Sequence, residues 1–185
     1  RGKVRCAVIN ASALGIYELR LNGNKVGEDY FAPGFTSYAH QLQYQTYDAT
    51  ELMAEANDIT AVVAGGWAVG SFTYGRKNRI SADRQAFLCE IRIEYEDGTA
   101  EVVGSGEDWE VTEDGNYRMA EWYDGETFDA RIDLRMARWR KATATEPRGK
   151  PALLAQYGDP VRARRILRPT SMAMAPSDEL IFDFG

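Results

Sequence analysis

Residues 86–103 read AFLCEIRIEYEDGTAEVV, and two features of this stretch indicate a β-hairpin. From Cys89 to Tyr95 every second residue is apolar and the residues between them are charged, which is the period of a strand with one buried face. Asp97-Gly98 follows, a dipeptide that readily adopts the positive φ angles of a two-residue hairpin turn. We therefore expect the second strand over residues 99–103.

Short strands of the same kind are predicted along most of the chain. Asn22-Gly23 predicts a second hairpin turn, and Asp48 or Thr50 can cap a single helical turn. No segment of ten or more residues keeps a helical period, so we expect one or two short helical turns. The further strands are expected at residues 4–9, 16–21, 25–27, 41–47, 58–64 and 109–112. This pattern predicts an all-β fold, an antiparallel β-sandwich of jelly-roll type.

The composition sets the size and excludes several classes of partner. With 185 residues, one domain is the default. The net charge of −6 repels nucleic acid and anionic membrane surfaces, and no apolar run is long enough to span a membrane. We therefore expect no nucleic-acid partner and no membrane partner. An export signal would lie upstream of residue 1, and a periplasmic or extracellular location is expected rather than a cytoplasmic one.

The chain changes character near residue 140. Residues 141–176 hold five of the six prolines and few alternating stretches. We expect residues 1–140 to form the sandwich, and residues 141–185 to form an irregular connector with the first strand of a following domain. The sequence thus resembles a piece of a longer protein.

The cysteines and the single histidine give little support for metal or redox chemistry. Cys6 and Cys89 lie in apolar runs without CxxC spacing, so they are expected in the core, with a disulfide between them left open. His40 is the only histidine, which excludes most imidazole relays, and we expect it to be solvated.

Residues 121–131, EWYDGETFDAR, hold four carboxylates. Paired carboxylates serve glycosidases as acid and base, but carboxylates this close in sequence need a particular fold to face one cleft. The alternative is a loop whose acids pair with Arg131 or Arg118. As an inter-domain or ligand loop, the candidate residues are Tyr123, Asp124, Glu126, Asp129 and Arg131.

Aromatic residues expected in loops suggest a sugar site. Aromatic faces stack on sugar rings while neighbouring polar groups bond the hydroxyls, although for any single aromatic core packing is the better explanation. Residues 65–72 are expected to form a wide glycine-containing loop, not a phosphate-binding one, because no GK[ST] follows. The aromatic residues are Phe31, Phe35, Tyr38, Trp67, Phe72, Tyr74, Trp122 and Tyr123.

From these positions we select a set of candidate carbohydrate-binding residues. They are Trp67, Phe72, Tyr74, Asn78, Asp83 and Asp29. Oxygen-rich side chains could also contribute to a calcium site, although no EF-hand spacing exists. These oxygen donors are Asp29, Asn78, Asp83, Asp124 and Asp129.

Five motifs in order resemble the N-terminal domain of bacterial α-L-rhamnosidases of glycoside hydrolase family 78. They lie at residues 12–18, 21–27, 32–38, 43–48 and 123–131, and the closing residues 182–185 resemble the entry to the following β-domain of that family. The resemblance implies a galactose-binding-like sandwich placed before a catalytic (α/α)₆ barrel. It also implies that no catalytic residue lies in this chain and that a related sandwich can bind rhamnose with calcium.

Two departures from the family pattern fall in the loop that we favour for ligand contact. Ala68 follows the tryptophan where an aromatic residue is usual, and Ala82-Asp83 replaces a common Gly-Asp pair. Two hypotheses therefore stay open. In the first, the domain positions rhamnose-containing glycans for the barrel. In the second, it is a structural module that docks on neighbouring domains and has no sugar affinity.

Overall fold

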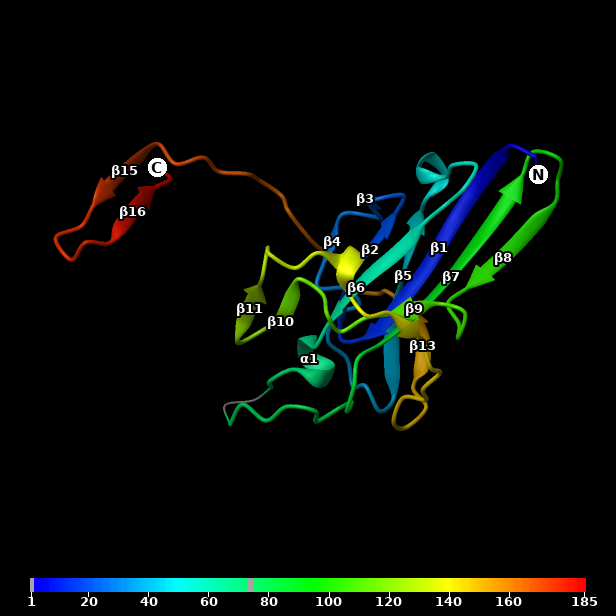
Figure 1. Ribbon diagram of the computed structural model, residues 1–185, viewed down its shortest axis with the longest axis horizontal. Helices are drawn as coiled ribbons and strands as arrows, with labels where there is room; N and C mark the ends of the chain where they lie inside the picture. The colour runs from blue at the N-terminus through cyan, green and yellow to red at the C-terminus, as the bar shows by residue number, and fades with distance from the viewer. Residues whose placement is uncertain (1, 73–74) are drawn as a thin grey trace.

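Two β-sheets pack face to face in the computed structural model, which describes residues 2–72 and 75–185. The larger sheet has the order β13-β5-β1-β7-β8 and the smaller one β3-β2-β6, and Figure 1 shows the smaller sheet lying across the larger one. The strands of the larger sheet are β1 (Val4–Leu14), β5 (Gln41–Asp48), β7 (Ala86–Tyr95), β8 (Ala100–Gly104) and β13 (Ala152–Ala155). Those of the smaller sheet are β2 (Ile16–Leu21), β3 (Asn24–Lys25) and β6 (Ile59–Ala64).

The alternating pattern that defines the strands also defines the core. In β7 the four apolar residues at alternate positions 89, 91, 93 and 95 are buried, while Glu90 and Arg92 are exposed. β1 pairs antiparallel with β7, so that Ile9 lies opposite Ile91. The buried residues of β1 belong to the same core cluster as those of β7. Leu19 and Leu21 of β2 are 1% exposed and close the core from the smaller sheet. The predicted all-β sandwich is confirmed.

The two predicted hairpin turns differ in geometry. At Asn22-Gly23 both residues have positive φ, 52° and 78°, as a two-residue type I′ turn requires. At Asp97-Gly98 only the glycine has positive φ, 84°, and beyond the pair Glu94–Ala100 the Tyr95 N–H donates to the Thr99 carbonyl at 2.9 Å. The prediction of a second two-residue turn was therefore wrong. The loop has three residues, 96–98, which is a common hairpin connection with a glycine at its last position.

Helical structure is confined to three single turns within the described residues, one more than the one or two expected: η1 (Thr50–Leu52), α1 (Gly66–Val69) and η2 (Leu134–Met136). η1 lies where a helical turn was expected, and the Asp48 carboxylate accepts the Thr50 backbone N–H at 2.9 Å. α1 lies in residues 65–72, which we predicted as a wide loop. That prediction was wrong because Ala68 and Val69 pack into a second buried cluster with Leu14 and Tyr38, and burial favours a compact turn.

The described residues form four further two-stranded sheets, all of them short. They are β10–β11, β9–β12, β4–β14 and β15–β16. Their strands are β4 (Asp29–Tyr30), β9 (Glu110–Val111), β10 (Tyr117–Glu121), β11 (Gly125–Phe128), β12 (Arg140–Lys141), β14 (Val161–Arg162), β15 (Ser171–Met174) and β16 (Leu180–Asp183).

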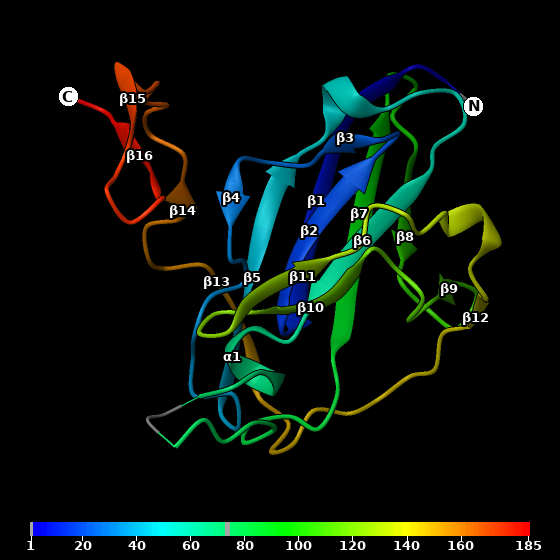
Figure 2. The same cartoon turned by 60° about the vertical axis from the view of Figure 1, so that its left-hand side comes forward.

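The segment expected to be an irregular connector contains strands that belong to the sandwich. β13 adds to the edge of the larger sheet by pairing parallel with β5, and β14 pairs with β4. The β15–β16 hairpin, in contrast, stands away from the sandwich in both views (Figures 1 and 2). A boundary between domains at residue 140 stays a prediction.

The remaining expectations concern single residues and membrane spans. Both cysteines are free; Cys89 is buried and Cys6 half-buried, so the alternative of a disulfide is ruled out. His40 is exposed, as expected. In the part of the chain that the structure describes, no helix is long and apolar enough to cross a membrane.

Candidate functional site

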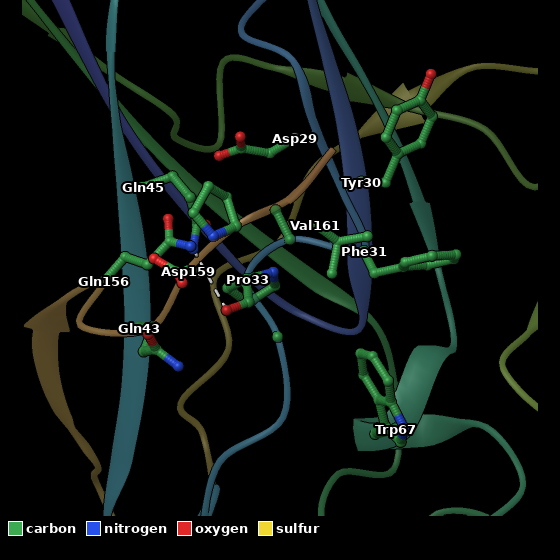
Figure 3. Close-up of a pocket in the computed structure, with 14 residues that line it drawn as sticks. Asp29, Tyr30, Phe31, Pro33, Gln43, Gln45, Trp67, Gln156, Asp159 and Val161 are labelled. Carbon is green, nitrogen blue, oxygen red and sulfur yellow. Dashed lines mark hydrogen bonds between the residues drawn. The ribbon is translucent and has the colours of Figure 1, made fainter. Parts of the chain in front are cut away.

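A pocket of about 110 Å³ opens between the start of β5, the turn after β4 and the segment that follows β13. Figure 3 shows Gln45, Gln156 and Asp159 gathered on one side of this pocket, with Phe31 and Trp67 on the other. Its lining combines polar side chains with aromatic ones. The lining residues are Asp29, Tyr30, Phe31, Ala32, Pro33, Gly34, Gln43, Gln45, Trp67, Gln156, Gly158, Asp159, Pro160 and Val161.

The turn at residues 31–34 is held from behind by the sandwich. The Tyr17 backbone N–H donates to the Ala32 carbonyl at 2.9 Å, and the Gly34 N–H donates to the Phe31 carbonyl at 3.0 Å. The Gln45 side-chain amide donates to the Pro33 carbonyl at 3.3 Å, the contact dashed in Figure 3. These bonds satisfy backbone groups that burial would otherwise leave unpaired, so they fix one wall of the pocket.

Some polar groups of the pocket are already committed to the protein. Gln45 is fully buried, and its side-chain oxygen also accepts a hydrogen bond from the Tyr17 hydroxyl at 2.9 Å. The Gln43 side-chain oxygen accepts the Tyr157 backbone N–H at 3.2 Å, and Asp29 is paired with Arg162 at 2.8 Å. Among the described residues, no side-chain hydrogen bond occupies the Asp159 carboxylate or the Gln156 amide. These two groups are therefore available to a polar ligand.

An aromatic cluster continues from the pocket onto the surface. Phe31 and Trp67 are shared by the pocket and the cluster, with ring centroids 6.5 Å apart. Trp122 lies 4.7 Å from Phe31 and 4.8 Å from Trp67, and Phe35 stacks on Phe72 at 5.3 Å. The aromatic cluster comprises Phe31, Phe35, Trp67, Phe72, Trp122 and Tyr123. Several of its rings are substantially exposed, from 37% for Phe31 to 53% for Phe35.

Helix α1 places Trp67 at the edge of the pocket. Its buried residues Ala68 and Val69 anchor the turn, so that Trp67 faces Phe31 and Trp122. Gly66 has a φ of 50°, and a Cβ atom there would lie 2.7 Å from the Ile16 side chain. Gly66 thus allows the backbone to approach β2 closely, which is a structural role.

The turn of the β10–β11 hairpin is tied to the loop after α1. The Glu121 carboxylate accepts the Ser71 backbone N–H at 2.8 Å, and Asp124 forms an ion pair with Arg76 at 2.6 Å. A hydrogen bond with the Ser71 side chain, together with the Arg76 guanidinium, holds the pKa of the Asp124 carboxyl below its usual range. These contacts position Trp122 beside Trp67.

The predicted carbohydrate residues fall into three groups. Asp29 and Trp67 line the pocket together, and Phe72 belongs to the adjacent aromatic cluster. Asn78 and Asp83 are exposed and line neither this pocket nor the cluster, and Asp83 lies 3.6 Å from Arg84. Tyr74 lies outside the described residues. Sugar contact at these positions stays a prediction.

The loop predicted at residues 123–131 is divided in the same way. Tyr123 contacts Phe72 at 6.3 Å between ring centroids, and Asp124 holds Arg76 as described. Glu126 is exposed in β11, and Asp129 pairs with Arg131 at 2.7 Å at the base of the hairpin. The hairpin thus brings Tyr123 and Asp124 next to the candidate site and keeps the other three away from its aromatic edge.

Sequence reasoning did not single out the four polar residues Gln43, Gln45, Gln156 and Asp159 of the pocket. Gln43 and Gln45 sit in a strand that reads as alternating polar and aromatic, yet both are buried. Two buried glutamines in one strand are unusual and mark a place where polar groups face the protein interior. Gln156 and Asp159 carry no local signal, since the fold brings them to β5.

The residues present do not form a calcium cage. Four of the five candidate oxygen donors already face an arginine, in the ion pairs Asp29–Arg162, Asp83–Arg84, Asp124–Arg76 and Asp129–Arg131. Over residues 2–72 and 75–185, no three acidic, histidine or cysteine side chains converge as a metal site requires. Calcium chemistry therefore finds no support in this arrangement.

Comparison with known proteins places this fold in a family. The α-L-rhamnosidase N-terminal domain profile matches residues 2–165. An α-L-rhamnosidase of Streptomyces avermitilis is 34% identical over 99% of this chain, which covers 18% of that protein, and one from Alteromonas sp. is 29% identical over 97% of this chain and 20% of that protein. The chain thus spans about a fifth of the length of these relatives.

Solved structures agree. The crystal structure of the Streptomyces avermitilis α-L-rhamnosidase complexed with L-rhamnose matches 94% of this chain and 18% of its own, with a TM-score of 0.82 and 36% identity. Native α-L-rhamnosidase from Aspergillus terreus matches 99% of this chain and 22% of its own, with a TM-score of 0.83 and 27% identity. This chain belongs to the family of α-L-rhamnosidase N-terminal domains.

Proposed function

We propose that this domain serves a longer α-L-rhamnosidase as a non-catalytic accessory domain that holds a rhamnose unit of a glycan. The observation that carries this proposal is the convergence of polar side chains and aromatic faces in one pocket of about 110 Å³. Asp159 and Gln156 offer free hydrogen-bonding groups for sugar hydroxyls, and Trp67 with Phe31 offers ring faces for the apolar side of the sugar.

The expected affinity is weak. Rhamnose has about eleven heavy atoms, and roughly 0.3 to 0.5 kcal/mol for each gives about 3 to 5 kcal/mol of binding free energy. That free energy corresponds to a dissociation constant on the order of millimolar. An accessory domain can work in this range because it is attached to an enzyme. Once one of the two has bound a glycan, the other meets that glycan at a high effective concentration.

Titration of the chain with L-rhamnose, followed by amide chemical shifts, tests the proposal. We expect shifts at residues of the pocket, a millimolar dissociation constant and loss of binding in Trp67→Ala. Trp139→Ala is the matched control, since Trp139 is 48% exposed and lies outside the pocket and the aromatic cluster. Repetition with a calcium chelator should change nothing. Binding that survives Trp67→Ala, or no binding at tens of millimolar sugar, would contradict the proposed site.

A second candidate function is docking onto neighbouring domains without sugar affinity. The β15–β16 hairpin favours it. Because residues two apart in a strand share a face, Met172 and Met174 lie with their partners Phe182 and Leu180 on one side. All four are 48–65% exposed. An isolated two-stranded hairpin is only marginally stable in water, so this apolar face suits coverage by another part of the enzyme. Sugar titration without any shift would leave docking as the better account.

A further inference from the structure

One wall of the pocket comes from a segment far along the chain from the others. Five of its lining residues lie between positions 156 and 161, whereas Gln43 and Gln45 lie on β5 and Asp29 begins β4. We call residues 156–162 the strap. Figure 3 shows Gln156 and Asp159 of the strap beside Gln45 of β5, on the side of the pocket opposite Phe31 and Trp67. Without the strap the pocket would be an open groove beside β5.

Hydrogen bonds, not apolar burial, hold the strap in place. The Gln156 backbone N–H donates to the Tyr44 carbonyl at 3.0 Å, and the Tyr157 N–H donates to the Gln43 side chain at 3.2 Å. β14 adds only two residue pairs with β4, and Val161 is 53% exposed. Segments with few buried apolar contacts and exposed backbone hydrogen bonds are those that open locally at low free-energy cost.

The ion pair between Arg162 and Asp29 is different in kind from these contacts. The Asp29 side chain is only 7% exposed, whereas that of Arg162 is 41% exposed. A buried carboxylate that loses its counter-charge is strongly disfavoured, so the Arg162 guanidinium compensates Asp29 as long as the strap is closed. The hydrogen bond and charge of Asp29 raise the pKa of Arg162, and Glu28 adds to this. Opening the strap must break this pair.

We propose that Arg162 is a positioning residue that latches the strap across the pocket through Asp29. The latch itself does not depend on what the pocket binds. Its consequence for a sugar rests on the proposed function. If the strap must be closed for binding, the apparent affinity falls in proportion to the fraction of molecules that are closed. The strap leads into residues 163–185, which carry the β15–β16 hairpin (Figure 2).

Hydrogen–deuterium exchange of the 185-residue protein without ligand tests the latch. In Arg162→Gln we expect the amides of Gln156 and Tyr157 to exchange about ten-fold faster or more, because the strap opens more often. The Ala49 amide, bonded to the Ala7 carbonyl at 2.8 Å in the core, should not change. Arg164→Gln is the matched control, since it removes a neighbouring exposed guanidinium without an ion pair among the described residues.

Asp29→Asn completes a double-mutant cycle. We expect Asp29→Asn to speed strap exchange too, and Arg162→Gln added to it to give no further increase, because the pair is already broken. Strap exchange in Arg162→Gln equal to that in wild type, or two increases that simply multiply in the double variant, would overturn the latch. Because the Arg162 side chain is 41% exposed, we expect Arg162→Gln to fold. The comparison of Arg162→Gln with wild type therefore tests the latch even if Asp29→Asn does not fold.

Adding L-rhamnose separates this inference from the proposed function. Saturating L-rhamnose should slow the exchange of the strap amides in the wild-type protein. Arg162→Gln should bind L-rhamnose more weakly, by the same factor by which the fraction of molecules with a closed strap falls. No sugar binding together with faster strap exchange in Arg162→Gln would refute the proposed function and support the latch. Sugar binding of equal strength in both proteins would refute the role of the latch in the pocket.

Discussion

The substitution Tyr17→Phe removes one hydroxyl from the polar network behind the pocket. The Tyr17 Oη donates to the Gln45 side chain at 2.9 Å and lies 3.1 Å from the Tyr47 hydroxyl. Burial raises the pKa of Tyr17 far above its ordinary value and that of Tyr47 to about 12, so both phenols stay protonated at any working pH. Gln45 in turn holds the Pro33 carbonyl at the pocket wall.

The expected cost follows from the partner that is left behind. Gln45 is 2% exposed, so its side-chain oxygen has no water to replace the lost donor. A buried acceptor left unsatisfied costs about 1–3 kcal/mol of unfolding free energy. For a chain of this size each kcal/mol lowers Tm by about 2–4 °C, so Tyr17→Phe should lower Tm by about 2–12 °C.

Thermal unfolding followed by circular dichroism measures this, with Tyr30→Phe as the matched control. Tyr30 is 48% exposed, and its ring lies under the Lys25 amine at 3.7 Å, a contact that phenylalanine keeps. The control should change stability by less than about 0.5 kcal/mol. Equal Tm values for the two variants would refute the reasoning, since the buried hydroxyl would then be dispensable.

Three other outcomes are expected. Brief alkylation at pH 8, read by mass spectrometry, should modify Cys6 and spare Cys89, whose pKa burial raises to about 12; modification of both in the folded protein would count against the buried position of Cys89. Tm should fall below about pH 4, because hydrogen bonds in the folded state lower the pKa of several aspartates, so the stabilisation present above their ordinary pKa is lost as pH falls through the lowered one; an unchanged Tm down to pH 2 would contradict this. These aspartates are Asp48, Asp97, Asp129 and Asp133. The chain alone should not hydrolyse an aryl α-L-rhamnoside, and turnover that disappears in Asp124→Asn or Glu126→Gln would show that its acids are catalytic.

Local physics made the strands predictable. The alternation from Cys89 to Tyr95 and the Asn22-Gly23 turn act between neighbours in sequence, so they are legible without a structure, and the structure confirms both. The three-residue loop at 96–98 was missed because turn type depends on where strand pairing ends, at Tyr95 and Thr99, and not on the dipeptide alone.

The candidate site was only partly predictable. Trp67 and Asp29 were selected because an aromatic ring and a carboxylate are chemically suited to a sugar wherever they stand. Their meeting in one pocket depends on α1, whose helical turn is favoured by the burial of Ala68 and Val69 against Leu14 and Tyr38, far away in the sequence.

By itself, then, the sequence determined the strands of the two main sheets other than β13, the sandwich class and the family. Only the tertiary structure decided that the pocket exists and what closes it. Gln156 and Asp159 reach β5 because β13 pairs with it, and Arg162 reaches Asp29 across 133 positions. Such contacts leave no periodic trace in the sequence, because they depend on long-range strand pairing and on compensation of one buried charge.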